Sequence, residues 1–519
     1  MGGDGAQPEG APCILAGFGR VGRFRANAVV QRPDSRRTGV LRTVVIRTTH
    51  RTVLSSDNQI QGVMPVIQVT VQVSDASGTI QPLADTWVMV VRSGTNNDNA
   101  ASLAKTNAEG VALLNPWQVA PDQLYWVQAD TPAGVRLQAL LGQTVPSVVV
   151  LNELTTIAAI WAAAQFIAPT GYITGPALPM KIVAGMAANL VNPVTGQPST
   201  LLSDPPNGRQ TMTLRTLNSL ANLLAGCNTN PDTLSELLQL TGNDAGTATA
   251  ALQWVATNPA LRCDSIFALS TRVTAYPRPL EAPPTAWTLG VKINATGSTL
   301  NPYGGPGNVA FDANGMAWIA NNVIQGSPNA TKYSICLNPD GSPATGGSGP
   351  GAVVTSPGLL GPGFGVWVWQ DEVWYGNFGW GDSPEFNQPR YGASRFDANT
   401  GVWLGDYHAP PLKRDEKPKP DEKLLSQRTQ SVMADSKGNL WCANYQSGGV
   451  TVLLNDGART AIYLSLAHPA DPKLHFGAFG LACIDTPDGT AAWVTSSTPV
   501  GALALVTLSG TTLSLSQSR

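Results

Sequence analysis

The sequence has few charged residues, and the two signs are nearly balanced. Charged residues make up 13% of the 519 residues and the formal net charge is −2, whereas about a quarter of the residues in a typical domain are charged. A dominant nucleic-acid-binding role usually leaves a basic excess, so this balance argues against one. No apolar run of about eighteen residues occurs, because residues 148–167 are interrupted by polar side chains, and an integral membrane protein is therefore excluded.

The sequence has few residues that bind metals or form disulfides. The chain holds only 4 His, and its 6 Cys are widely spaced without a CxxC pair, so no zinc site is expected. Cys227 and Cys263 flank one predicted helical segment, and they either form a disulfide in an exported protein or remain two buried thiols. Cys442 and Cys483 lie in the repeats described below and are expected in the core.

Turn-forming and apolar residues are plentiful. The chain contains 53 Gly, 40 Pro and 14 Trp, and 43% of its residues are hydrophobic. This composition predicts short strands joined by many turns around hydrophobic cores, and it excludes global disorder. A chain of this length is expected to form about two to four domains.

Residues 1–55 differ from the rest of the chain. They hold nine Arg and no Lys, and we expect them to be poorly ordered. They contain no apolar core of the kind that a signal peptide needs, although we expect the natural protein to be exported. Gly17, Gly19 and Gly22 have the GxGxxG spacing of a dinucleotide-binding loop, but no βαβ unit surrounds them, so we attribute the match to chance.

Two further domains are predicted before residue 285. In residues 56–151, short alternating segments predict an antiparallel β-sandwich. The order of its strands and turns resembles the carboxypeptidase-regulatory-like (Ig-like) modules of secreted bacterial proteins, which implies a spacer role. Residues 152–284 predict an α-helical domain that begins at the N-cap Asn152, with helices near 180–192, 214–227, 233–240 and 248–258.

A motif that recurs four times predicts the fold of residues 285–519. The copies span residues 308–321, 366–377, 432–444 and 481–496, and each is a strand, a turn and a second strand. A second hairpin follows each copy, so every repeat supplies one four-stranded blade of a β-propeller. A strand at 287–293 could close the ring, which leaves the number of blades at four or five. The four repeated tryptophans, expected between the blades, are Trp318, Trp374, Trp441 and Trp493.

The repeat also has a recognisable form. Its first copy reads Asp312-x-x-Gly315-x-x-Trp318-x-Ala320-Asn321, which resembles the repeats of bacterial NHL-repeat and streptogramin-lyase-like propellers. Together with the segments before it, the resemblance implies a mainly β protein in which a sandwich and an α-helical insert precede the propeller.

Propellers bind ligands where the loops of several blades converge, and the residues expected there are mostly aromatic or amide-bearing. Such a surface suits a small neutral ligand, a glycan or a protein, although Asn after a strand often caps a turn. The predicted ligand-binding residues are Tyr303, Asn321, Asn322, Asn377, Trp380, Arg428, Asn444 and Tyr445.

An enzyme is the alternative. His475 with Glu372 or Asp382 is the only pairing of a His with a carboxylate that could converge. The resemblance implies a metal-assisted lyase or a calcium-dependent lactonase, with Ca²⁺ or Mg²⁺ as the cofactor and with Asn377, Asn444 and Asp435 as possible ligand types. The repeats end in Asn or Ser where lyase-type repeats often show Glu, which disfavours this alternative.

The sequence therefore predicts an extracytoplasmic ligand- or protein-binding protein, an adhesion or scaffold molecule, that uses its propeller surface. We expect it to be a monomer that needs no cofactor and has no transmembrane segment. Residues 413–423 combine many charges of both signs with proline, so we expect them to form a solvated loop between the second and third blades.

Overall fold

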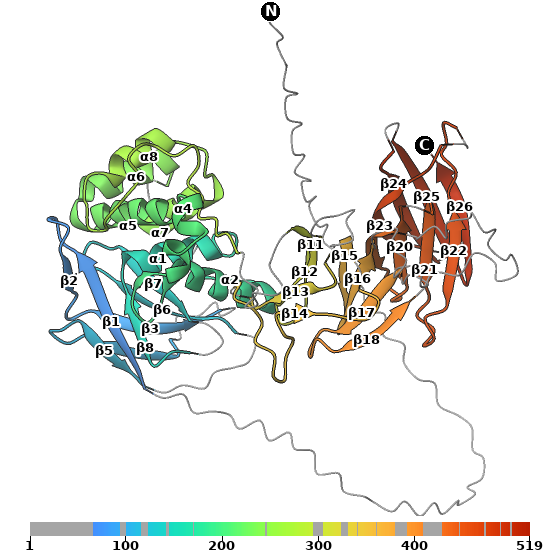
Figure 1. Cartoon of the computed structure of the whole chain (residues 1–519). Coiled ribbons are helices and arrows are strands. Elements are labelled where there is room, and N and C mark those ends of the chain that lie inside the picture. Colours follow the sequence, from blue (N-terminus) through green and yellow to red (C-terminus); the bar gives the residue numbers. More distant parts are fainter. Residues whose placement is uncertain are drawn as a thin grey trace, which may run out of the picture. The chain divides into compact units, whose positions relative to one another are not determined.

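The structure is a computed structural model (Figure 1). It describes residues 66–93, 100–115, 123–141, 145–169, 171–243, 246–293, 305–322, 331–339, 341–359, 361–378, 392–407, 428–445, 447–471, 474–487, 489–498 and 501–518. Residues 1–55 with their GxGxxG motif, and the charged insert at 413–423, lie outside these residues.

The first part of the described chain consists of two four-stranded sheets. One has the order β2-β1-β5 with β8 also paired to β1, and the other has the order β4-β3-β6-β7. Their strands are β1 (Ile67–Ser74), β2 (Ile80–Pro82), β3 (Trp87–Arg92), β4 (Ser102–Lys105), β5 (Val111–Leu114), β6 (Tyr125–Asp130), β7 (Arg136–Leu141) and β8 (Val148–Leu151). β8 runs parallel to β1, so the expectation of a purely antiparallel arrangement is wrong.

The two sheets share one hydrophobic core. Ile67, Val69 and Val71 project from β1 and pack with Val88 and Val90 from β3, and all five are fully buried. The alternation that predicted β1 from the sequence is visible in its burial, because Gln68 between these residues is exposed.

Helices follow the two sheets. They are α1 (Glu153–Ala163), α2 (Ala177–Leu190), α3 (Thr200–Ser203), α4 (Asn207–Gln210), α5 (Thr213–Thr229), α6 (Pro231–Thr241), α7 (Ala248–Thr257) and α8 (Cys263–Ser270). A two-stranded ribbon of β9 (Val191–Asn192) and β10 (Gln197–Pro198) follows α2. Asn152 caps α1 as predicted, because its Oδ1 accepts a hydrogen bond of 3.0 Å from the backbone N–H of Thr155.

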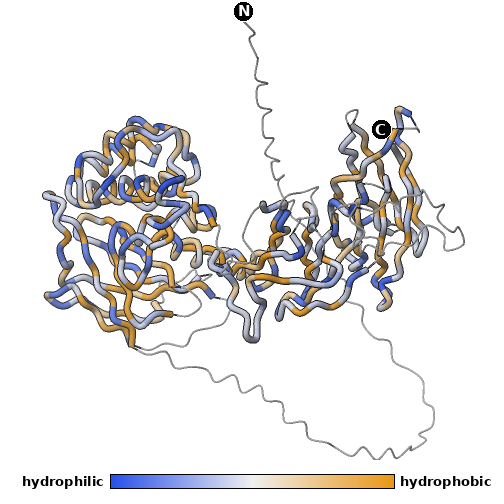
Figure 2. Tube along the Cα trace, viewed as in Figure 1, coloured by the Kyte–Doolittle hydropathy of each residue, from blue (hydrophilic) through white to orange (hydrophobic). Residues whose placement is uncertain are grey.

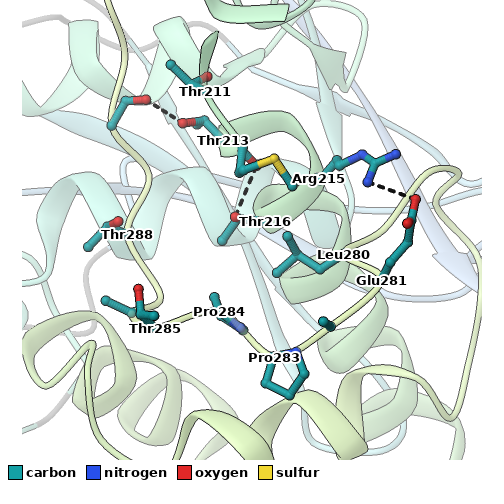
Figure 3. Close-up of a pocket in the computed structure, with 14 residues that line it drawn as sticks. Thr211, Thr213, Arg215, Thr216, Leu280, Glu281, Pro283, Pro284, Thr285 and Thr288 are labelled. Atoms are coloured by element: carbon teal, nitrogen blue, oxygen red, sulfur yellow. Dashed lines mark hydrogen bonds and ion pairs between the residues drawn. The ribbon is translucent and has the colours of Figure 1, made fainter. Parts of the chain in front are cut away.

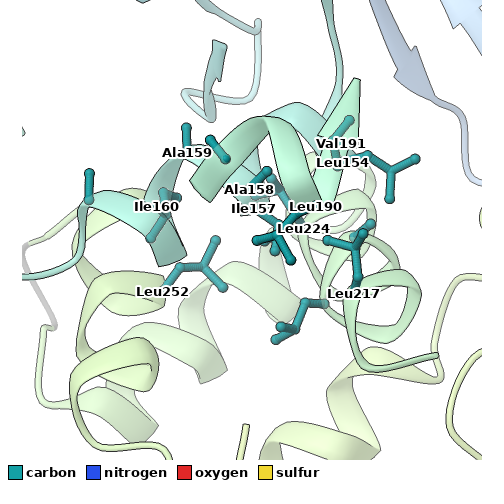
Figure 4. Close-up of a cluster of buried hydrophobic side chains, with 14 of the residues drawn as sticks. Leu154, Ile157, Ala158, Ala159, Ile160, Leu190, Val191, Leu217, Leu224 and Leu252 are labelled. Atoms are coloured by element: carbon teal, nitrogen blue, oxygen red, sulfur yellow. The ribbon is translucent and has the colours of Figure 1, made fainter. Parts of the chain in front are cut away.

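One hydrophobic cluster holds the helices together. Figure 4 shows Leu154, Ile157 and Ile160 of α1 beside Leu224 of α5 and Leu252 of α7. Each of these side chains is at most 1% exposed, so α1 is the centre of this core rather than a surface helix.

Residues 287–293 do not form the strand that was expected to close the propeller. Trp287 is fully buried in the helical cluster, and its carbonyl accepts a hydrogen bond of 3.1 Å from Trp161 Nε1. The prediction is wrong because Trp287, Leu289 and Val291 pack on helices and do not pair with a sheet edge.

The rest of the described chain forms four four-stranded antiparallel sheets, each made of consecutive strands, as propeller blades are. Figure 2 shows hydrophobic residues along many of their strands. Blade 1 is β11 (Pro306–Phe311), β12 (Ala317–Asn321), β13 (Ser334–Leu337) and β14 (Val353–Val354); blade 2 is β15 (Pro362–Trp369), β16 (Glu372–Asn377), β17 (Ala393–Asp397) and β18 (Trp403–Tyr407); blade 3 is β19 (Thr429–Ala434), β20 (Leu440–Asn444), β21 (Gly449–Leu453) and β22 (Ala461–Ser465); blade 4 is β23 (Ala478–Thr486), β24 (Gly489–Ser496), β25 (Ala502–Ser509) and β26 (Thr512–Ser518).

The repeated tryptophans join consecutive blades. Trp318, Trp374 and Trp441 are at most 1% exposed, and each packs in a hydrophobic cluster with residues of the following blade. This confirms the predicted role of these three, whereas Trp493 of blade 4 is only partly buried.

The cysteines of the described chain are free thiols. Cys227 is buried and Cys263 is half-buried, and no disulfide joins them, so of the two alternatives the structure has the unpaired one. Cys442 lies in the core as predicted, and Cys483 packs at the edge of the cluster between blades 3 and 4. None of the described helices combines the length and apolar character that a membrane crossing requires.

Candidate functional site

Four side chains from blades 2, 3 and 4 meet at one edge of the sheets, and we call them the blade-end cluster. Phe378 follows β16, Arg428 precedes β19, Tyr445 follows β20 and His475 precedes β23. In each blade the first residue of the first strand is paired with the last residue of the second strand, as Thr429 is with Asn444. The four residues therefore lie at equivalent ends of neighbouring strands.

The cluster forms a continuous row of ring contacts. The Arg428 guanidinium carbon lies 5.7 Å from the centre of the Phe378 ring, which lies 5.9 Å from that of Tyr445. The Tyr445 ring meets the His475 ring edge to face, with centres 5.8 Å apart. Phe378 is buried, Arg428 and Tyr445 are half-buried and His475 is exposed, so the part of the row from Phe378 through Tyr445 to His475 runs from the interior to the surface.

The orientation of the His475 ring is fixed by Tyr445. Nε2 of His475 donates a hydrogen bond to the Tyr445 carbonyl oxygen, which can only accept. In the neutral ring Nδ1 is then an acceptor, available to a hydroxyl or amide donor. Gly448 makes this position possible: its φ is +67°, and a Cβ there would lie 3.2 Å from Cε1 of His475.

A buried amide lies beside the cluster. Gln430 is 1% exposed, and neither atom of its side-chain amide has a hydrogen-bond partner. A Cβ on Gly363 would lie 3.2 Å from Cβ of Phe378 and 3.4 Å from Oε1 of Gln430, so the two side chains flank the same point. Buried amides are normally paired, so a water or a ligand group is expected to satisfy this one.

Arg428 holds a strained backbone at the start of β19. Its φ is 49°, in the left-handed region that is unfavourable for residues other than glycine, Asn and Asp. Strained residues cluster at binding sites, where the surrounding structure enforces them.

Three of the predicted asparagines serve the blades themselves. Asn321, Asn377 and Asn444 are at most 4% exposed at the ends of their strands. Nδ2 of Asn377 donates to Ser394 Oγ at 3.0 Å, and Nδ2 of Asn444 donates to Thr451 Oγ1 at 2.8 Å, so each joins the second strand of its blade to the third. We therefore leave these residues out of the candidate site. Asn322 is half-buried and directly follows β12 in blade 1, whereas the cluster is drawn from blades 2, 3 and 4.

The structure does not bring Glu372 and His475 together, so this predicted catalytic pair is wrong. Glu372 begins β16, at the opposite end of the blade from Asn377 and Phe378. Its carboxylate accepts from Arg459 at 2.8 Å and from the Trp374 indole at 3.1 Å, which commits it to packing between blades 2 and 3. Tyr303, Trp380 and Asp382 lie outside the described residues.

Among the described residues, no group of three or more His, Cys, Asp or Glu side chains is arranged to hold a metal ion. Asp435, considered for that role, is 3% exposed and accepts hydrogen bonds from the backbone of its own turn and from Trp441. It is a turn-forming residue, as the repeat suggested.

A separate pocket lies in the helical part and was not anticipated from the sequence. It has a volume of about 620 Å³ between the start of α5 and the extended segment 280–290. Figure 3 shows that Thr211, Thr213 and Thr216 border it together with the ion pair of Arg215 and Glu281, whose charged atoms are 2.9 Å apart. Its lining is both polar and apolar, because Met212, Leu280 and Pro283 border it beside the threonines and the ion pair.

The chain has a weak similarity to several solved structures. No family model matches it, and no curated protein matches it, so the resemblances to NHL repeats and to the carboxypeptidase-regulatory-like module remain predictions. It is similar to a streptogramin B lyase at 14% identity and a TM-score of 0.26, over 40% of this chain and 52% of that one. Virginiamycin B lyase from Staphylococcus aureus is 15% identical with a TM-score of 0.26, over 43% of this chain and 57% of that one. A putative 6-phosphogluconolactonase from Bacteroides uniformis is 11% identical with a TM-score of 0.23, over 42% of this chain and 74% of that one.

The chain thus spans little more than half the length of the two lyases. The assignment of propeller blades rests on the four sheets of the chain itself.

Proposed function

We propose that the protein is an extracytoplasmic binding protein whose blade-end cluster holds a small neutral ligand, such as part of a glycan. The single observation that carries this proposal is the row from Phe378 through Tyr445 to His475, drawn from three successive blades. A site that spans several blades is pre-organised by their packing, which lowers the cost of binding.

The chemistry of the cluster suits a ring that carries hydroxyl groups. The half-buried Tyr445 ring offers an apolar plane, and Nδ1 of His475 is the ring nitrogen left for a ligand hydroxyl group, because Nε2 is hydrogen-bonded to the Tyr445 carbonyl oxygen. The unpaired Gln430 amide offers two N–H donors and a carbonyl acceptor in a buried position. No carboxylate belongs to the cluster as described, so a cationic ligand is a poorer match.

The enzyme alternative, a metal-assisted lyase or hydrolase, has less support. His475 lies in the cluster, but Glu372 does not, and Arg459 already neutralises its carboxylate. The alternative requires a base from elsewhere in the chain. It predicts turnover that depends on Ca²⁺ or Mg²⁺ and is lost in His475→Ala.

A location outside the cytoplasm is part of the proposal, supported by the resemblance of residues 56–151 to modules of secreted proteins. Fractionation of cells that express the full-length gene tests this directly. Recovery in the cytoplasmic fraction alone would overturn the location without affecting the binding site.

The function is tested by thermal unfolding of the full chain with maltotriose, chitotriose, γ-butyrolactone, CaCl₂, MgCl₂ and EDTA. A ligand at 100 times its Kd stabilises the folded state by about 2.7 kcal/mol, which is easily detected. We expect a glycan to raise the melting temperature without a cation. A rise that needs Ca²⁺ and is reversed by EDTA would favour the enzyme.

Variants assign the effect to the cluster. Tyr445→Ala is expected to weaken binding about tenfold, or by about 1.4 kcal/mol, since the stacking plane is lost. The matched control is Trp403→Ala, which removes an aromatic ring that is 45% exposed on the outermost strand of blade 2. Equal weakening by both variants, or by neither, would contradict the proposed site.

A further inference from the structure

Consecutive blades pack through equivalent positions. The residues opposite the repeated tryptophans in the first strands are Ala310, Trp367, Met433 and Ala482. The residue before each of these therefore also occupies an equivalent place. This residue is Val366 in blade 2 and Val432 in blade 3. Both are at most 3% exposed, and each packs against the preceding blade.

Blade 1 is the first blade of the described chain, and its equivalent residues are open. Val309 corresponds to Val366 and is 45% exposed, and Phe311, two residues later on the same face, is 49% exposed. Further out on this blade Ile319 and Ile335 are covered by Ile293, so the open area lies along the first strand, β11.

Blade 4 is the last blade of the described chain, and its complementary face is open. Trp493 is equivalent to the three buried tryptophans but is only partly buried. Ile484 lies two residues beyond Ala482, which is opposite Trp493, and is therefore on the same face; it is 44% exposed. Exposed apolar side chains gathered on one face of a sheet usually mark an interface.

The two open faces do not cover each other within one chain. In the described part of the chain, β23 packs against β19 as β19 packs against β15, whereas β11 packs against β15 and shows no comparable packing against β23. Each chain thus presents the two halves of one more blade junction, on different blades.

We propose that a second copy of this chain supplies the missing junctions. Blade 4 of each copy packs against blade 1 of the other, so that two chains close one ring of eight blades around a two-fold axis. Eight blades lie within the range known for propellers, and two-fold dimers are the commonest closed assemblies. A second copy is favoured over another partner because its blade 1 offers the open face that blade 4 lacks a neighbour for. The contact between them would repeat the junctions already present between blades 1 and 2, 2 and 3, and 3 and 4.

This arrangement replaces the monomer expected from the sequence, and it does not depend on the proposed ligand. The test is the mass in solution of the full chain at micromolar concentration, by light scattering coupled to size exclusion. We expect twice the 54.3 kDa of one chain. A wild-type protein that stays at 54.3 kDa would overturn the proposal.

Three variants locate the contact. Phe311→Asp and Ile484→Asp place a charge on the blade 1 face and the blade 4 face, and both are expected to give monomers with an unchanged circular dichroism spectrum. Val402→Asp is the control, because Val402 is 58% exposed next to β18 and away from both faces; it should remain a dimer.

A mixture of the two monomeric variants distinguishes this ring from other dimers. Blade 4 of the Phe311→Asp chain and blade 1 of the Ile484→Asp chain are both intact, so the mixture regains one good junction and should form a heterodimer. A dimer that joins like faces predicts that one variant stays dimeric and that mixing restores nothing, and either result would refute the arrangement.

Discussion

Oδ2 of Asp435 accepts a hydrogen bond from the indole Nε1 of Trp441 at 3.0 Å. Oδ1 of the same carboxylate accepts from the backbone N–H of Lys437 and Asn439 and so closes the turn between the two strands. Asp312 and Trp318 repeat the pair in blade 1, also at 3.0 Å. One acid therefore fixes both the turn and the tryptophan that packs against the next blade.

Removing this acid should destabilise blade 3. Asp435→Ala leaves buried N–H groups unpaired, and we expect a loss of about 2–4 kcal/mol in the free energy of unfolding. Urea denaturation measures the change. Asp456→Ala is the control in the same blade, because Asp456 lies in an exposed turn and should matter little; a comparable loss there would contradict the role given to Asp435.

Neighbouring residues in blade 3 should separate stability from binding. Asn444 is fully buried, accepts from Thr429 at 2.9 Å and donates to Thr451, so Asn444→Ala should cost about 1–3 kcal/mol of stability. Ligand affinity, measured by calorimetry below the melting temperature, should stay close to that of the wild type. Tyr445→Ala should show the reverse pattern, and an equal loss of affinity in both variants would mean that the two residues act as one unit.

Buried thiols should make stability depend on alkaline pH. Burial raises the pKa of Cys227 and of Cys442 to about 12, from an ordinary value of 9.0. Their stabilising contribution is complete below pH 9, where both the folded and the unfolded chain keep the proton, and it falls as pH rises from 9 towards 12 because only the unfolded thiols ionise. Urea unfolding in a reducing agent at rising pH should show this decline. The double variant Cys227→Ala, Cys442→Ala should show a shallower decline, and identical slopes would be contrary to expectation.

A buried carboxylate should couple the first sheets to the helices. Glu153 of α1 is fully buried, accepts from the backbone N–H of Ser74 in β1 at 2.9 Å and accepts from the Tyr276 hydroxyl at 2.7 Å. Glu153→Ala should cost about 3 kcal/mol or more, since both donors lose their partner. Glu153→Gln keeps one acceptor oxygen and should cost less. Equal effects of the two substitutions would indicate that packing alone matters at this position.

The blades could be predicted from the sequence because their signal is local and repeated: turn residues such as Asp312 and Gly315 and the tryptophan after them recur at similar spacing. The strand expected at 287–293 failed because an apolar alternating segment fits a helical core as well as a sheet, and only tertiary packing chooses between them. The helix α8 was not predicted, because a segment this short shows little helical periodicity.

The candidate site was predictable in part. Arg428, Tyr445 and His475 were found because they lie at corresponding ends of the repeats. Phe378 was missed although it follows Asn377 as Tyr445 follows Asn444, which is the signal that would have found it. Gln430 could not have been found, because its lack of a partner is a property of the packed structure.

Hydrogen–deuterium exchange of the full chain, with and without the glycan that stabilises it most, tests the central claim most directly. Binding at the blade-end cluster predicts slower exchange in peptides that contain Arg428–Gln430, Tyr445 and His475, and little change elsewhere. Slower exchange confined to the pocket beside Thr213 and Arg215, or no change in any peptide at saturating ligand, would contradict it.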